Sequence, residues 1–139
     1  MNWMLLAAAF GAGTVATFTD WLFMGVLFHA EYNRYPEVWW PGVREGKENG
    51  PIIWSSAIGY VMTAAIFVLC GLSGIHSIRS GLAVAAAAWI AGPLGIVVIN
   101  GFFIKIDGKI TFAHCLGYLT RMLLAGGAAG FALSGIAAP

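Results

Sequence analysis

The chain has 139 residues, of which 60% are hydrophobic and only 9% are charged. A soluble domain carries about 25% charged residues, so this composition excludes an ordinary water-soluble core and favours a protein surrounded by a lipid bilayer. The formal net charge of +1 creates no field that would attract nucleic acid. Cys70 and Cys115 both lie in apolar stretches and are too few for a disulfide framework.

The first apolar stretch covers residues 3–28 and contains one charged residue, Asp20. A hydrocarbon core about 30 Å thick needs roughly 20 apolar residues, so this stretch is long enough to cross it. No basic segment precedes it, and it is longer than the apolar part of a signal peptide. We therefore interpret it as a permanent transmembrane helix.

The segment 29–51 follows and is the only sizeable stretch that we predict outside the spans. It is rich in tyrosine, tryptophan, proline and residues of both charges. Aromatic and charged residues at the end of a span are typical of the lipid headgroup layer, which is the simpler interpretation of this segment. A loop that controls access of a substrate is the alternative.

Three further apolar stretches cover residues 52–72, 82–103 and 112–136, and their only charged residue is Arg121. Because these runs are continuous and lack the alternation of barrel strands, they are predicted to be helices. Dense glycine and alanine in the last two favour close packing of helix backbones. The sequence therefore predicts an all-α fold: one transmembrane domain, residues 1–139, forming a four-helix bundle with up-down-up-down order.

Basic residues are distributed unevenly between the two ends of this predicted bundle. The connections 29–51 and 104–111 together carry five lysine or arginine residues, whereas the opposite end carries only Arg79. The positive-inside rule therefore predicts that these two connections are cytoplasmic and that both termini lie outside.

Asp20 and Arg121 are the residues that lipid should exclude most strongly. Each lies about eight or nine residues from the predicted cytoplasmic end of its helix, which places both roughly 12–14 Å below that surface. An unpaired charge at such a depth costs at least ~2.5 kcal/mol, and arginine can donate two hydrogen bonds to one carboxylate. We therefore predict that Asp20 and Arg121 form an ion pair.

Other polar side chains are predicted to lie near this pair. His114, Tyr118 and Arg121 recur at i, i+4 and i+7, so they share one face of the last helix. The predicted polar network, which is also the candidate ligand site, comprises Asp20, Tyr60, Asn100, His114, Tyr118 and Arg121. Two interpretations remain open: a structural network that fixes the packing of the helices, or a cavity for a small solute, ion or proton.

The sequence contains no motif of a known catalytic or cofactor site. P-loop, nucleophile-elbow, zinc-protease and paired-cysteine patterns are all absent from it. His29 and His114 lack further ligands at a spacing typical of metal or haem sites. We predict no catalytic, metal or cofactor site, and a membrane enzyme or redox subunit is the third-ranked interpretation.

Residues 23–28, Phe-Met-Gly-Val-Leu-Phe, resemble the motif that ends the first helix in a family of small bacterial four-helix membrane proteins, described only as a domain of unknown function. Residues 89–118 are similar to the later half of that family, with Asn-Gly-Phe-Phe at the end of a span and Asp-Gly-Lys in the following turn. Met24 and Val26 stand where the family favours tyrosine and proline. The resemblance implies the fold and a location in the bacterial inner membrane, and it implies no activity.

These observations predict a small multi-pass membrane protein that acts through helix packing with a membrane-protein partner or with a second copy of itself. The alternative is binding or transport of a small solute, ion or proton at the polar intramembrane site. The two hypotheses differ in whether the Asp20–Arg121 pair serves only the fold.

Overall fold

A computed structural model describes residues 2–104 and 106–137, without the side chains of residues 38, 136 and 137. The secondary structure of this described part is entirely helical. Its elements in chain order are α1 (Trp3–Asp20), η1 (Trp21–Leu27), α2 (His29–Asn33), η2 (Pro36–Val38), α3 (Pro41–Arg44), α4 (Asn49–Leu72), α5 (Ile78–Trp89), η3 (Ile90–Leu94), α6 (Gly95–Phe103) and α7 (Gly108–Ala137).

Four helical stretches are long and apolar enough to cross a membrane: Trp3–Leu27, Asn49–Leu72, Ile78–Phe103 and Gly108–Gly135. The number of these stretches agrees with the number of predicted spans, but the last three begin three or four residues earlier than predicted. Polar side chains explain two of these starts. Ser77 accepts a hydrogen bond from the backbone N–H of Ser80, and Asp107 accepts one from Lys109, so each caps the first turn of the following helix.

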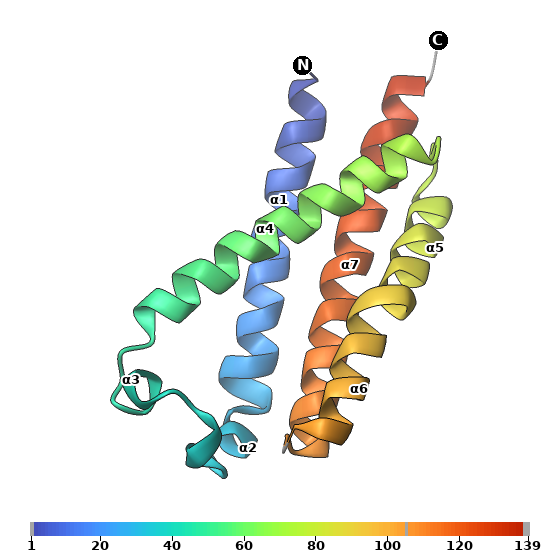
Figure 1. The fold of residues 1–139 in the computed structure, drawn as a ribbon. Coiled ribbons are helices and arrows are strands. Elements are labelled where there is room, and N and C mark those ends of the chain that lie inside the picture. The colour runs from blue at the N-terminus through green and yellow to red at the C-terminus, as the bar shows by residue number, and fades with distance from the viewer. Residues whose placement is uncertain (1, 105, 138–139) are drawn as a thin grey trace.

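The chain runs alternately down and up the bundle, as predicted (Figure 1). α1 with η1 descends, α4 ascends, α5 with η3 and α6 descends, and α7 ascends. Both termini therefore lie at one end of the bundle. The short helices α2, η2 and α3 and the turn between α6 and α7 lie at the other end, which we call the loop end.

α7 is the central helix and packs against α1, α4 and α5. The main buried cluster joins Ile66 and Cys70 of α4, Ala85 of α5, and Met122, Ala125 and Ala129 of α7. Glycine brings the backbones of α5 and α7 together, as the sequence predicted. A Cβ atom on Gly81 would collide with the carbonyl oxygen of Gly126, and one on Gly130 would collide with that of Ser77.

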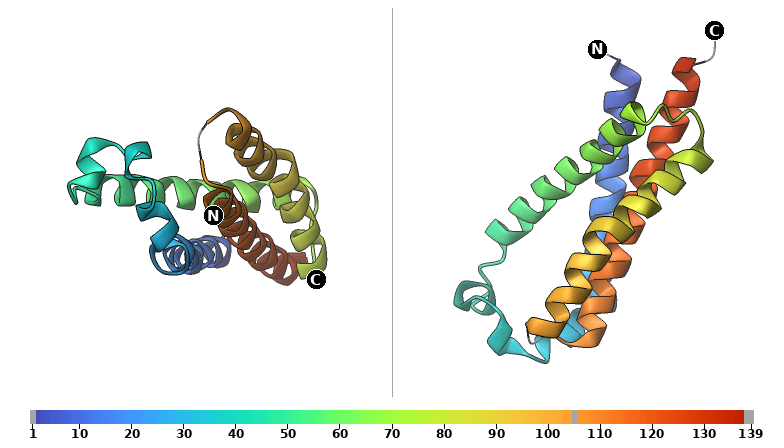
Figure 2. Two further views of the ribbon diagram at one scale, coloured as in Figure 1. Left: turned by 90° about the horizontal axis from the view of Figure 1, so that it is seen from below. Right: turned by 45° about the vertical axis from the view of Figure 1, so that its right-hand side comes forward.

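α4 crosses α1 and α7 obliquely instead of lying parallel to them (Figures 1 and 2). It contacts them near Gly59 and Thr63, which are both buried. Its first half projects away from the bundle, so Ile53 and Trp54 are 66% and 73% exposed. The bundle is therefore closely packed near the termini and more open near the loop end.

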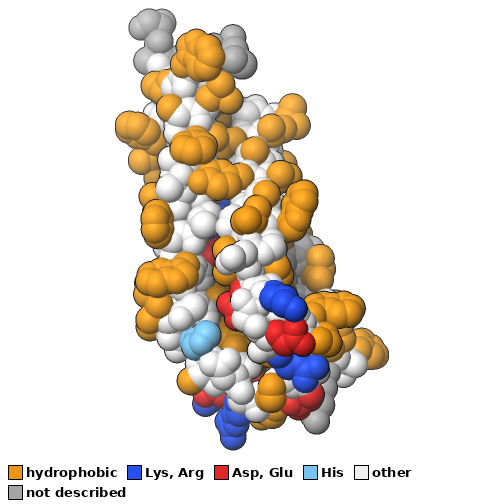
Figure 3. Space-filling model, turned by 90° about the vertical axis from the view of Figure 1, so that its left-hand side faces the viewer, with side chains coloured by type: hydrophobic (Ala, Val, Ile, Leu, Met, Phe, Trp, Pro, Cys, Tyr) orange, Lys and Arg blue, Asp and Glu red, His pale blue; other side chains and the backbone are white. Residues whose placement is uncertain are grey.

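Two π-helical turns interrupt the spans, η1 directly after Asp20 and η3 around Pro93. Proline has no backbone N–H and its ring displaces the carbonyl one turn earlier, which explains η3. Beyond η3, α6 packs against α7 less closely than α5 does. On the face drawn in Figure 3, hydrophobic side chains cover the helices and charged side chains gather at the loop end.

Candidate functional site

The predicted ion pair between Asp20 and Arg121 is present and joins the end of α1 to the middle of α7. Nε of Arg121 donates a hydrogen bond to Oδ2 of Asp20 over 3.1 Å, and Nη2 donates a second one to the same oxygen. The two partners differ in exposure: the Arg121 side chain is 3% exposed and that of Asp20 is 32% exposed. The pair can therefore be reached from the side of the carboxylate.

Gly59 of α4 provides the space that the guanidinium group occupies. A Cβ atom at this position would lie 2.6 Å from both Nη1 and Nη2 of Arg121. The guanidinium is thus held between the carboxylate of α1 and the backbone of α4. Sequence reasoning did not include Gly59 in the site, although a glycine in the interior of a helix is a signal of close packing.

Each partner of the pair keeps hydrogen-bonding capacity that the described residues do not use. Nη1 of Arg121 is buried and has no hydrogen-bond partner. Because Oδ2 of Asp20 accepts both bonds from Arg121, Oδ1 is left to other groups. Oδ1 faces Gly117, where an added Cβ atom would still be 3.7 Å away. The site therefore combines an unused donor and an unused acceptor on neighbouring groups.

Tyr60 joins α4 to α1 and directly follows Gly59, against which the guanidinium of Arg121 packs. Its hydroxyl oxygen lies 2.9 Å from Oγ1 of Thr14, and its ring stacks on Phe10 with 5.5 Å between centroids. The ring also fills the space beside Gly13, where a Cβ atom would lie 2.5 Å from it. The structure thus places Tyr60 next to the pair in the fold, but its hydroxyl is bonded to Thr14.

His114 and Tyr118 form a second polar group closer to the loop end. Nε2 of His114 lies 2.9 Å from the hydroxyl of Tyr32, and the Tyr118 ring stacks on His114 with 6.2 Å between centroids. Burial raises the pKa of Tyr32 above its usual range. Its hydroxyl therefore keeps its proton and donates a hydrogen bond to Sδ of Met24, and the same oxygen lies within hydrogen-bond distance of Nε2 of His114. Sequence reasoning missed Tyr32, which it assigned to an interfacial loop.

Asn100 is not part of this network, because its side chain is exposed on α6. The prediction treated residues 82–103 as one regular helix. A π turn contains about one residue more than an α-helical turn, which rotates the residues after it by about 100°. η3 lies between Trp89 and Asn100 and so moves Asn100 off the predicted face.

An ion pair at the loop end connects α2 to the start of α7. Nζ of Lys109 donates to Oε1 of Glu31 over 2.7 Å, and Arg34 lies 3.5 Å from Oε2. Lys109 thereby holds the pKa of the Glu31 carboxyl below its usual value. Together with the Tyr32–His114 contact, this pair fixes the first loop against α7.

Residues 2–104 and 106–137 contain no group of three or more histidine, cysteine or acidic side chains able to hold a metal ion. Comparison of the chain with models of known families, with curated proteins and with solved structures gave no match. The family resemblance read from the sequence therefore stays a prediction.

Proposed function

We propose that this chain is an integral protein of the bacterial inner membrane that binds a small polar solute at the Asp20–Arg121 pair. The observation that supports this most directly is the difference in exposure between the two side chains of the pair. Arg121 is buried with Nη1 unpartnered, whereas its partner Asp20 is 32% exposed on the side chain. A purely structural pair would be expected to satisfy its donors and to face the bundle interior on both sides.

In a lipid environment, the exposure of the Asp20 side chain indicates that water or a polar solute reaches it. A carboxylate whose exposed third faced acyl chains would lose hydration without compensation, at a cost of several kcal/mol. Water or a polar solute on that side removes the cost. The oblique course of α4 supports such access, because its first half leaves the part of the bundle below Gly59 less closely covered (Figure 2).

The chemistry of the pair favours a particular class of solute. Asp20 and Arg121 carry opposite charges, so the site has no net charge with which to attract a single ion. Oδ1 of Asp20 offers an acceptor on the accessible side of the pair, and Nη1 of Arg121 is a buried donor without a partner. A neutral or zwitterionic molecule with adjacent donor and acceptor groups matches this arrangement better than an inorganic ion does.

The orientation that we propose puts the loop end in the cytoplasm and both termini outside. Arg44 belongs to α3 and Lys109 to the start of α7, and Arg34 and Lys47 lie in the connections directly after α2 and α3, all at that end (Figure 1). Lys105, which the prediction also counted, lies outside the described residues. This clustering supports the positive-inside assignment made from the sequence.

Ligand-induced stabilisation tests the proposed binding function. The protein in lipid nanodiscs would be heated with a panel of amino acids, amines, sugars and inorganic anions. A solute present at 100 times its Kd raises the free energy of unfolding by about 2.7 kcal/mol, which is measurable as a shift in Tm. We expect a neutral or zwitterionic solute to give such a shift, and we expect Asp20→Asn and Arg121→Gln to abolish it.

Asn100→Ala is the matched control, since it removes a polar side chain from a span without touching the pair. It should leave the shift unchanged. A solute that stabilises Asp20→Asn as strongly as the wild type would contradict a site at this pair. So would a panel in which only inorganic ions bind.

Association through α4 is a second candidate function, supported by the exposed first half of that helix. Ile53, Trp54 and Ile58 are all more than half exposed on a segment that projects from the bundle. Single cysteines at Ile53 and Ile58 should form cross-linked dimers in native membranes, whereas a cysteine at Phe131 on α7 should not. Equal cross-linking at all three positions would indicate random collision and would exclude this surface.

A further inference from the structure

We propose that the groove between α6 and α7 holds one acyl chain of a membrane phospholipid from the leaflet at the loop end. The groove has a volume of about 360 Å³ and is lined by Trp89, Leu94, Val98, Gly108, Thr111, Phe112, Cys115, Leu116 and Leu119. It is separate from the Asp20–Arg121 pair. The proposal rests on the membrane insertion proposed above and not on solute binding.

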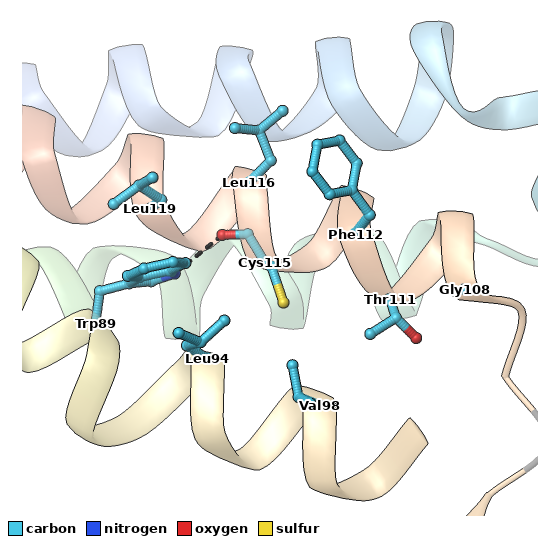
Figure 4. Close-up of a pocket in the computed structure, with 9 residues that line it drawn as sticks. All are labelled: Trp89, Leu94, Val98, Gly108, Thr111, Phe112, Cys115, Leu116 and Leu119. Carbon is cyan, nitrogen blue, oxygen red and sulfur yellow. Dashed lines mark hydrogen bonds between the residues drawn. The ribbon is translucent and has the colours of Figure 1, made fainter. Parts of the chain in front are cut away.

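The groove exists because the third span changes course at η3. Before this turn, glycine contacts hold α5 directly against α7. After it, α6 continues at a greater distance from α7, and Leu94 and Val98 point across the space toward Cys115 (Figure 4). A single helix without Pro93 would have kept the two backbones in contact and closed the groove.

The lining offers nothing to a polar ligand. The indole N–H of Trp89 donates to the backbone oxygen of Cys115 over 3.0 Å, and the Thr111 hydroxyl donates to the backbone oxygen of Asp107. Both polar side chains of the groove are therefore already hydrogen-bonded within the protein. The remaining side chains are aliphatic, aromatic or a thiol, so a hydrocarbon is the ligand that fits them.

The length and position of the groove identify the hydrocarbon as one chain of a single leaflet. Along α7 the lining runs from Gly108, at the loop end, to Leu119. At 1.5 Å per residue this distance is roughly 16 Å, close to half of a hydrocarbon core about 30 Å thick. If each methylene occupies roughly the volume of one liquid water, the groove holds on the order of ten methylenes.

Depth-resolved photocross-linking tests this proposal. The full-length protein in nanodiscs would be irradiated with phosphatidylcholine that carries a diazirine either near the ester or near the end of one chain. We expect the first probe to label the α7 segment around Thr111 and the second to label the segments around Leu119 and Trp89. Labelling of the groove should exceed that of the exposed outer face around Phe131 at least fivefold.

Val98→Trp fills the groove and should reduce groove labelling at least fivefold. Ile99→Trp is its matched control, because Ile99 is 55% exposed on the neighbouring face of α6; it should leave groove labelling unchanged. If Val98→Trp fails to fold, Leu94→Phe replaces it. Wild-type labelling that is no stronger in the groove than at Phe131, or that does not change with probe depth, would overturn the proposal. A chain that is extracted from membranes by alkaline carbonate would instead show that the proposed insertion is wrong.

Discussion

Gly59→Ala is the substitution that tests the packing of the ion pair most sharply. The new Cβ atom would lie 2.6 Å from Nη1 and Nη2 of Arg121 and 2.7 Å from its Cζ. These distances are far below ordinary contact, so the guanidinium has to move. It cannot move freely, because Nε and Nη2 are both bonded to Asp20.

The cost follows from the two ways in which the protein can respond. If the pair is kept, α4 shifts away, and overpacking of this kind costs about 1–3 kcal/mol. If Arg121 leaves Asp20, a buried pair is broken, at a cost of about 3–5 kcal/mol. We expect the cheaper response, a loss of about 2–3 kcal/mol. At roughly 3–5 °C per kcal/mol, Tm should fall by about 6–15 °C.

Thermal unfolding of the purified protein in nanodiscs is the assay, with two matched variants. Gly11→Ala lies in α1, where an added Cβ meets no atom within 4 Å, so it should be neutral or raise stability by about 0.5–1 kcal/mol. In an Arg121→Met background, Gly59→Ala should lose most of its cost. An equal loss in both backgrounds would refute the reasoning, because the clash would then not involve the guanidinium.

Gly81→Ala should lower the free energy of unfolding by about 2–4 kcal/mol, because its Cβ meets the backbone of α7. Gly127→Ala should be nearly neutral, because the closest neighbour of its Cβ is a Leu82 methyl at 3.6 Å. Thermal unfolding of the two variants measures this difference. Lys109 lowers the pKa of the Glu31 carboxyl in the folded protein below its value in the unfolded chain. The ionised carboxylate therefore stabilises the fold at a pH above the unfolded-state pKa, and this stabilisation is lost as the pH falls through the folded-state pKa. Lys109→Met should remove that acid-side step from a plot of Tm against pH, and an unchanged plot would show that the pair is too well screened to matter. Tyr32→Phe leaves the His114 ring without its hydroxyl partner and should lower the free energy of unfolding by about 1–2 kcal/mol. A loss below about 0.3 kcal/mol, measured by denaturant unfolding, would contradict this hydrogen bond.

The number of spans and the Asp20–Arg121 contact were predictable from the sequence. Hydropathy and length alone give four helices, because lipid leaves so few alternatives for an apolar backbone. In the proposed insertion, equal depth brings the acid and the base to the same level, and the cost of a lone charge makes their pairing favourable. Both inferences use general physics of the bilayer and need no detail of packing.

Finer features were not predictable, because they depend on contacts between distant segments. The π turn at Pro93 changes which residues of α6 face inward, and Asn100 is exposed instead of lying in the predicted network. His114 contacts Tyr32, which the prediction did not include, and Tyr118 stacks on His114. The starts of α5 and α7 were missed because polar caps extend these two helices beyond their apolar parts. The oblique course of α4 and the fit of Arg121 onto Gly59 arise from three-dimensional packing, which periodicity does not encode.

The central claim is that the Asp20 carboxylate is reached by water from within an apolar span. It is tested by replacing both native cysteines with alanine and placing single cysteines at Asp20 and at Phe18, which is 67% exposed on the same helix. In liposomes, a charged methanethiosulfonate reagent requires water and thiolate to react. The account predicts fast modification at position 20 and little at position 18, despite the greater exposure of Phe18. If the cysteine at position 20 reacts as slowly as the one at position 18, lipid covers both positions, and the claim is contradicted.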